Sequence, residues 1–252
     1  MGIGAVLGFF IGLTGVGGGA LVAPALFVVL GTTYTEAVAA SLVYSVFTKA
    51  IGFVQHQRQG NVLWRLTLLY GVPAIPGAII GSQLLYAFAS AERVFALLMS
   101  AVLAVVAVVL LLEASVRRLG DRERPLDPGH VGMRATIGIG LASFAIGILL
   151  GLTSVGSGSI IILTMVVLFR LSARHIVGTN IAISLVIVIP AGLTHVLAGG
   201  VRLPLLLLLV LGSVVGTVLG SRATMLVPDR ALKTAMGVLI LVSAVATAVR
   251  AW

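Results

Sequence analysis

A glycine-rich motif occurs twice in this chain, each time inside a long apolar segment. Residues 12–19 read Gly-Leu-Thr-Gly-Val-Gly-Gly-Gly, and residues 151–158, which lie 139 positions later, read Gly-Leu-Thr-Ser-Val-Gly-Ser-Gly. The same shift aligns other residues without a gap, such as His56 with His195. The chain is therefore a tandem duplication, and a duplicated apolar element that is broken by glycines is typical of membrane transporters with two pseudo-symmetric halves.

Long apolar runs determine the class of the protein. Hydrophobic residues make up 60% of the sequence and charged residues only 9%, and the mean hydropathy is +1.22, which fits an integral membrane protein. The runs are close to or longer than the ~20 residues that a spanning helix needs, and they do not alternate as the strands of a β-barrel do. The sequence thus predicts an all-α, polytopic membrane protein with eight apolar segments: 2–30, 37–54, 66–88, 94–112, 136–169, 176–198, 203–220 and 234–249.

The eight segments divide into two homologous repeats of four. A polar interval with mixed charges and two prolines separates the repeats, as expected of a solvated linker. We therefore expect a first transmembrane repeat at residues 1–113, a polar linker at 114–134 and a second transmembrane repeat at 135–252. Apolar sequence begins at Gly2 without a preceding charged region, so we interpret the N-terminal segment as a spanning element rather than a signal peptide.

The first segment of each repeat is too long for one simple helix. As a continuous helix, residues 2–30 would extend ~44 Å, whereas the hydrocarbon core is ~30 Å thick. The three consecutive glycines at 17–19 also disfavour an unbroken helix, so we expect two half-length helices that meet at the motif. These halves either continue across the membrane, which gives eight crossings and parallel repeats, or turn back as a re-entrant hairpin, which gives three crossings per repeat and inverted repeats.

The positive charges in the loops favour the re-entrant arrangement. With eight crossings, nine of the loop arginines and lysines fall on one side of the membrane and six on the other. With re-entrant hairpins, twelve fall on one side, and only Arg93, Arg202 and Arg250 fall on the other. The positive-inside rule therefore favours re-entrant, inverted repeats. It also accounts for the net charge of +9 without a nucleic-acid partner.

The interrupted helices predict an anion-binding site. A helix break in the bilayer leaves backbone N–H groups that protein, water or a substrate must satisfy. The N-terminus of the following half-helix carries partial positive charge, glycines let an anion approach the backbone, and hydroxyl groups add donors. We therefore predict a substrate-binding site near the midplane of the membrane, formed by both motifs: Thr14, Gly15, Gly17, Gly18, Gly19, Thr153, Ser154, Gly156, Ser157 and Gly158.

Other glycines recur at four-residue spacing, which typically allows helices to pack closely. We predict this packing role for Gly4, Gly8 and Gly12, for Gly77 and Gly81, and for Gly212, Gly216 and Gly220. Similar faces on the outside of the bundle would permit a homodimer.

Polar residues inside the apolar segments are the remaining functional candidates. Lys49 has no charged counterpart in the second repeat, and it either attracts an anionic substrate or extends its amine toward an interface. Ser41 and Asn180 occupy equivalent positions that suit substrate coordination. His56 and His195 are also equivalent, and they either take part in proton coupling or hold a turn.

Several function classes lack their sequence signatures. The chain has no cysteine, which excludes disulfides and thiolate metal sites, and we expect neither a metal nor a cofactor. It has few acidic residues, no His-Glu-x-x-His motif and no recognisable Ser-His-Asp set, so we do not expect an enzyme. No ATP-binding P-loop occurs, which argues against ATP-driven pumping. A structural or receptor subunit would not require duplicated broken helices.

Several ordered motifs carry a family resemblance. In the first repeat these are the glycine motif, Pro24, Ala40-Ser41-Leu42, His56, Gly60-Asn61-Val62 and Trp64, and in the second they are the glycine motif, Val177-Gly178-Thr179-Asn180, His195, Gly199 and Val201. This pattern, which covers nearly the whole chain, resembles the sulfite exporter TauE/SafE family of membrane permeases. The resemblance implies movement of sulfite, sulfonates or other small organic anions across the bacterial inner membrane, driven by the proton motive force.

One residue departs from the family pattern. Many relatives carry aspartate where this chain has Asn180, and an asparagine cannot take up a proton, so proton coupling through this side chain is not expected. We expect a proton-coupled secondary transporter for a small anion, embedded in membrane lipids. An anion channel of the same architecture is the alternative.

Overall fold

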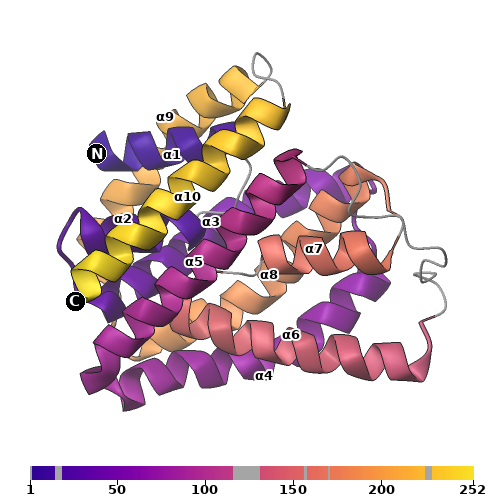
Figure 1. Ribbon diagram of the computed structural model, residues 1–252, viewed down its shortest axis with the longest axis horizontal. Helices are drawn as coiled ribbons and strands as arrows, with labels where there is room; N and C mark the ends of the chain where they lie inside the picture. The colour runs from indigo at the N-terminus through magenta and orange to yellow at the C-terminus, as the bar shows by residue number, and fades with distance from the viewer. Residues whose placement is uncertain (1, 15–18, 116–130, 156–157, 170, 225–228) are drawn as a thin grey trace.

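The computed structural model describes residues 2–14, 19–115, 131–155, 158–169, 171–224 and 229–252. This part of the chain is all-helical, as the sequence predicts, and contains ten α-helices and one short 3₁₀ helix (Figure 1). The helices are α1 (Gly2–Thr14), α2 (Gly19–Val28), α3 (Tyr34–Arg58), α4 (Trp64–Ala87), η1 (Ala89–Ala91), α5 (Glu92–Ser115), α6 (Met133–Thr153), α7 (Ser159–Leu168), α8 (Ala173–Leu197), α9 (Leu203–Thr224) and α10 (Asp229–Ala251).

The helix boundaries follow the 139-residue shift between the two halves. Shifting α3 by this distance reproduces both ends of α8, and shifting α4 reproduces the start of α9. The predicted interruption of the first segment is present in both halves, where α1 is followed by α2 and α6 by α7. Most of the predicted linker, residues 116–130, lies outside the described residues, between the end of α5 and the start of α6.

Local sequence signals set the ends of the two equivalent long helices. Before α3, the Thr33 side chain accepts a hydrogen bond from the Glu36 backbone N–H at 3.3 Å, which is a typical N-terminal cap. After α3 and α8, the chain reverses at Gly60 and Gly199, whose φ angles are +69° and +72°. Glycine adopts this left-handed conformation without a Cβ clash, so both halves use the same stop signal.

The first helix of each half packs against the fourth helix of the other half. A Cβ at Gly8 of α1 would overlap the Ser213 backbone of α9, and a Cβ at Gly77 of α4 would overlap the Phe144 carbonyl of α6. Gly4, Gly81 and Gly216 make equally close approaches to these partner helices. The predicted packing role is confirmed for these five glycines, because only a missing side chain allows such contact.

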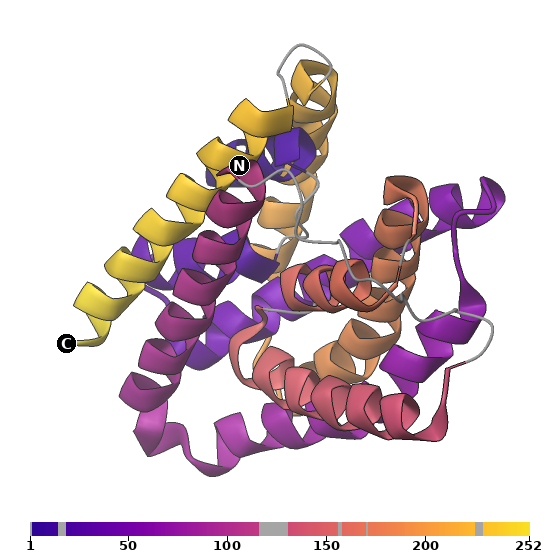
Figure 2. The same ribbon diagram turned by 45° about the vertical axis from the view of Figure 1, so that its right-hand side comes forward.

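Helices α5 and α10, which occupy equivalent places in the two halves, run antiparallel. Along α5 and α10, the Arg93 guanidinium lies 4.4 Å from the Trp252 ring centroid, and further on the Ser100 hydroxyl donates to the Ala244 carbonyl at 2.8 Å. The residue numbers thus rise on one helix as they fall on the other, and the two helices lie side by side in both ribbon views (Figures 1 and 2). This is the relation that inverted repeats require.

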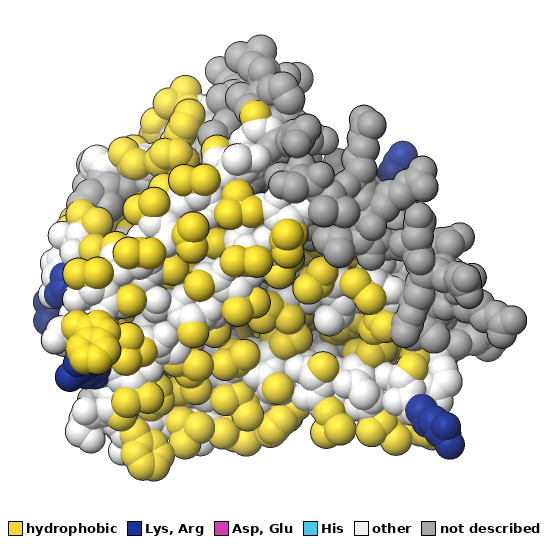
Figure 3. All heavy atoms as spheres, viewed as in Figure 1, with side chains coloured by type: hydrophobic (Ala, Val, Ile, Leu, Met, Phe, Trp, Pro, Cys, Tyr) yellow, Lys and Arg dark blue, Asp and Glu magenta, His cyan; other side chains and the backbone are white. Residues whose placement is uncertain are grey.

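The lengths and surfaces of the helices fit a multi-pass membrane protein. Six of the described helices are long and apolar enough to cross a membrane: α3, α4, α5, α6, α8 and α10. The apolar part of α9, Leu206–Gly220, is shorter. Among the described residues on the face seen in Figure 3, hydrophobic side chains cover much of the surface and the visible Arg and Lys side chains lie near its edges, as expected of a surface that contacts lipid acyl chains.

Candidate functional site

The interruption in the second half is a tightly bonded turn. Helix α6 ends at Thr153, whose hydroxyl donates to the Leu149 carbonyl at 2.6 Å and accepts from the Val155 N–H at 3.2 Å. Ser154 has a φ of +60°, and it is the only non-glycine residue with positive φ in the described part of the chain. Non-glycine residues rarely adopt this left-handed conformation, and those that do are often found at functional sites.

The interruptions of the two halves meet. The start of α2 lies against the end of α6, so closely that a Cβ at Gly19 would overlap the Ser154 carbonyl. Ser154 also donates from its hydroxyl to the Ser41 hydroxyl of α3 at 2.8 Å. The Tyr34 hydroxyl, also from the first half, donates to the Leu152 carbonyl at 2.9 Å, which satisfies one of the acceptors at the end of α6. The predicted convergence of the motifs is therefore present for Gly19 and Ser154.

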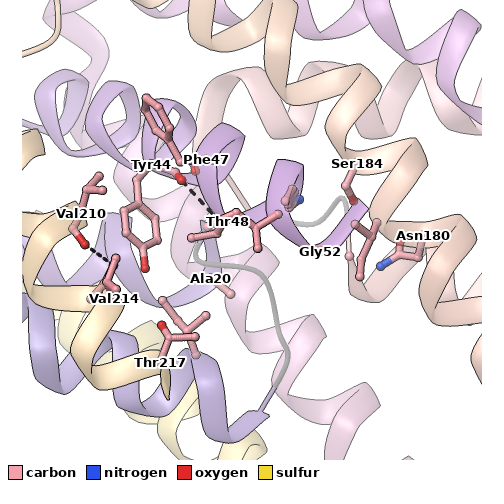
Figure 4. Close-up of a pocket in the computed structure, with 18 of the residues that line it drawn as sticks. Ala20, Tyr44, Phe47, Thr48, Gly52, Asn180, Ser184, Val210, Val214 and Thr217 are labelled. Atoms are coloured by element: carbon pink, nitrogen blue, oxygen red, sulfur yellow. Dashed lines mark hydrogen bonds between the residues drawn. The ribbon is translucent and has the colours of Figure 1, made fainter. Parts of the chain in front are cut away.

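A cavity of about 380 Å³ opens beside this junction. Its walls come from α3, α8 and α9, and the glycine breaks contribute Gly19, Ser154 and Gly158 (Figure 4). Asn180 and Ser184 approach the cavity from α8 on one side, while α9 presents Val210, Val214 and Thr217 on the other. The volume falls within the range that is typical of sites for small molecules.

The cavity gathers some of the predicted site residues and leaves others elsewhere. Gly19, Lys49, Ser154, Gly158 and Asn180 line it. Ser41 and Thr153 are buried and do not line the cavity, but both hold the Ser154 turn through hydrogen bonds. The side chain of Thr14 lies outside the described part of the chain. So do five other predicted residues, which are Gly15, Gly17, Gly18, Gly156 and Ser157.

The two predicted histidines are not part of the cavity. His195 is buried near the end of α8, where its Nδ1 is hydrogen-bonded to the Tyr86 hydroxyl at 2.8 Å. His56 is half-buried near the end of α3, with its Nδ1 3.4 Å from Nδ2 of Asn61. The partner of His195 lies in α4, and the partner of His56 lies just before α4. These contacts fit the interpretation that the histidines hold a turn or a helix contact, rather than take part in proton coupling.

Lys49 is the only charged residue among the described residues that line the cavity. It is half-buried in the second half of α3, within one of the predicted membrane spans. In a low-dielectric surrounding, a single ammonium group attracts an anion over several ångströms. Among the described residues, no group of three or more His, Asp or Glu side chains could hold a metal ion.

Sequence reasoning missed several polar residues that line the cavity, among them Tyr44, Ser184 and Thr217. Helical spacing from the predicted residues would have found two of them. Tyr44 follows Ser41 by three positions and Ser184 follows Asn180 by four, so each shares a helix face with its predicted neighbour. Thr217 had no such signal, because no residue of α9 was a candidate.

Comparison with known proteins agrees with this architecture. Residues 1–247 match the family described as "Sulfite exporter TauE/SafE". The chain is 35% identical over 246 residues to "Probable membrane transporter protein YjnA" of Bacillus subtilis (strain 168), which covers 96% of this chain and 95% of that protein. It is 26% identical over 231 residues to "Probable membrane transporter protein YdhB" of the same organism, with 92% and 91% covered.

No solved structure matches significantly, so the comparison rests on sequence. The family match spans nearly the whole chain, including both glycine motifs and every helix that lines the cavity. The protein is therefore a multi-pass membrane protein that belongs to the sulfite exporter TauE/SafE family of transporters.

Proposed function

We propose that this protein is a secondary transporter that moves a small anion, such as sulfite, a sulfonate or another organic anion, across the bacterial inner membrane in exchange or symport with protons. The observation that carries the proposal is the cavity where the helix breaks of both halves meet, in which Lys49 is the single charged residue among the described lining residues. A site with one cation and several hydroxyl and amide groups favours an anion over a cation or a neutral solute.

The contacts at the helix ends support the re-entrant, inverted arrangement. Glu36, near the start of α3, forms an ion pair with Arg202, just before α9, with Oε1 and Nε 2.7 Å apart. With eight crossings, these residues would lie on opposite faces of the membrane, whereas re-entrant hairpins put them on the same face. Arg250, near the end of α10, donates to the Val28 carbonyl at the end of α2 at 3.0 Å. These two residues also lie on the same face of the membrane only in the re-entrant arrangement.

Labelling of single cysteines tests this topology. We expect Thr33→Cys and a cysteine added before Met1 to react with an impermeant maleimide from the same face of the membrane. Gln59→Cys, in the loop after α3, is the matched control and should react from the opposite face. Reaction of the Thr33 and N-terminal cysteines from opposite faces would contradict the re-entrant arrangement.

Flux into proteoliposomes tests the function itself. Sulfite uptake is measured with and without an imposed pH gradient, for the wild-type protein and for Lys49→Met. We expect wild-type flux that saturates with sulfite concentration and follows the pH gradient, and weaker flux in the variant. Flux that never saturates and ignores the gradient would favour the anion channel, because a channel does not couple the two movements. An absence of flux would require a different substrate.

A further inference from the structure

Two buried hydroxyl groups at the cavity have no protein partner. Ser184 of α8 and Tyr44 of α3 both line the cavity, and each is only 1% exposed. Neither the Ser184 Oγ nor the Tyr44 Oη forms a hydrogen bond with any described residue. Buried hydroxyls in folded proteins are nearly always paired, so each exception needs an explanation.

Several other hydroxyls in the described helices find a partner in their own backbone. Thr194 donates to the Pro190 carbonyl at 2.9 Å, and Thr247 donates to the Ser243 carbonyl at 2.7 Å. Thr48, next to Lys49, donates to the Ser45 carbonyl at 3.2 Å. This bond to a carbonyl three or four residues earlier is the usual arrangement for Ser and Thr in membrane helices, and Ser184 does not use it.

The two hydroxyls belong to different walls of the cavity. Ser184 projects from α8, one turn beyond Asn180, whereas Tyr44 lies on α3 toward α9 (Figure 4). Tyr44 interacts with Ser213 of α9, whose hydroxyl donates to the Val210 carbonyl at 3.0 Å, but the Tyr44 Oη is within hydrogen-bond distance of no described residue. The two hydroxyls thus lie in opposite walls of the cavity, just beneath its surface, because neither oxygen atom exposes as much as 1 Å².

We propose that Ser184 and Tyr44 are substrate-binding residues, whose hydroxyls donate to oxygen atoms of the transported anion from opposite walls of the cavity. This inference rests on the proposed function and assigns the recognition groups within that site. Lys49 attracts negative charge from any direction, but hydroxyl donors select acceptors at defined positions. A pyramidal or tetrahedral oxyanion group presents acceptor oxygens in several directions and fits this pair of donors.

The chain offers matched controls. Tyr70, Ser82 and Ser143 are also buried, and their hydroxyls also lack a hydrogen-bond partner among the described residues. None of the three is among the residues that line the cavity. If unpaired hydroxyls are only an accident of helix packing, Tyr70→Phe and Ser82→Ala will behave like Tyr44→Phe and Ser184→Ala.

Sulfite flux into proteoliposomes separates the two explanations. We expect Ser184→Ala and Tyr44→Phe each to raise the KM for sulfite by about tenfold, as loss of a hydrogen bond to a charged group does, with a maximal rate within about twofold of wild type. Tyr70→Phe and Ser82→Ala should leave the KM within about twofold. The inference is overturned if the cavity variants have the KM values of the controls.

Thermal unfolding of the purified protein gives a readout that does not depend on transport. Without an added anion, the cavity variants should unfold at the wild-type temperature or above it, because they remove a hydroxyl that has no protein partner. A lower unfolding temperature than in the controls would indicate a structural role and would overturn the inference.

Stabilisation of the protein by added anions tests the inference even if the wild-type protein moves no sulfite and the proposed substrate is wrong. Sulfite, sulfate, methanesulfonate and acetate are added separately, and the shift in unfolding temperature is measured. A shift that occurs in wild type and in the controls, but not in Ser184→Ala or Tyr44→Phe, would support the inference. Equal shifts in all proteins, or no shift with any of the four anions, would overturn it.

Discussion

The two halves of this protein contain equivalent helix pairs that pack very differently. Helices α4 and α8 are in close contact, since a Cβ at Gly71 would lie 3.1 Å from Cγ1 of Val186, and the Leu63 N–H donates to the Thr179 hydroxyl at 3.0 Å. The equivalent pair is α9 and α3, where the positions of Gly71 and Val186 are occupied by Val210 and Phe47. Both of these residues line the cavity.

Side-chain chemistry differs in the same direction. On the cavity side, α3 presents Tyr44, Thr48 and Lys49, and α9 presents Ser213 and Thr217. The equivalent positions on α8 and α4 are apolar and buried: Ile183, Ile187, Val188, Ala74 and Ala78. Of the two equivalent helix pairs, α3 and α9 thus line the cavity with polar side chains, whereas the contact between α4 and α8 is sealed and mainly apolar at the equivalent positions. Equivalent helix pairs therefore need not enclose equivalent cavities.

Exchanging a residue between the two sides should have the largest effect. Val188→Lys places an ammonium group at the sealed position that is equivalent to Lys49, where Ile187 and Ala191 are fully buried. We expect a loss of about 3 kcal/mol in unfolding free energy, measured as a reduced yield of monodisperse protein and a lower unfolding temperature. A Val188→Ile control should remain folded, and wild-type stability of Val188→Lys would contradict the assignment of this side as sealed.

The reciprocal change should affect binding rather than folding. Lys49→Met removes the only charge among the described residues that line the cavity, and we expect the KM for sulfite to rise by about tenfold or more, because a charge-assisted interaction is lost. The unfolding temperature should remain close to that of wild type. A large loss of stability with an unchanged KM would assign Lys49 to the packing of α3 instead.

Two equivalent glycines, Gly19 at the start of α2 and Gly158 just before α7, offer a third test of the asymmetry. A Cβ at Gly19 would overlap the Ser154 carbonyl, whereas a Cβ at the equivalent Gly158 would lie 3.8 Å from Nδ2 of Asn180, an ordinary contact distance. We expect Gly19→Ala to lower the unfolding free energy by about 1–2 kcal/mol and to reduce flux, while Gly158→Ala stays near wild type. Equal losses of unfolding temperature in Gly19→Ala and Gly158→Ala would contradict the expected difference between the two positions.

The smallest effect is expected at the ion pair between α3 and the segment before α9. The Arg202 side chain is 68% exposed, so the bond with Glu36 is screened by solvent. Arg202→Gln should lower the unfolding free energy by less than about 1 kcal/mol, and the difference should shrink in high salt. A larger, salt-independent loss would indicate that this contact is needed to hold the cavity side together.

The sequence alone predicts the framework of this fold well. Apolar runs of sufficient length and the 139-residue shift identify the spanning helices, and the glycine motifs locate the interruptions between α1 and α2 and between α6 and α7. Apart from the shift, which compares the two halves, these features are local, because each depends on the length, hydrophobicity and glycine content of one segment. The packing role of Gly8 and Gly77 also follows from local spacing.

The walls of the cavity were less accessible to sequence reasoning. Lys49 and Asn180 were identified because polar residues are rare inside apolar segments, but Val210 and Val214 are ordinary residues of an apolar helix. Their place in the cavity depends on which helix of one half packs beside which helix of the other. The asymmetry between Gly71 and Val210 was visible in the aligned repeats, but only the three-dimensional contacts give it a meaning.

The first helix of each half packs against the fourth helix of the other half, and this arrangement has a consequence for biosynthesis. Helix α1 packs against α9, whose first residue is Leu203, so the glycine face of α1 has no protein partner until almost the whole chain has been synthesised. Helix α4 likewise lacks its partner α6 until the second half begins to be synthesised. The first half therefore cannot complete its own packing during translation, and the two halves expressed as separate polypeptides should accumulate only when both are present in the same membrane.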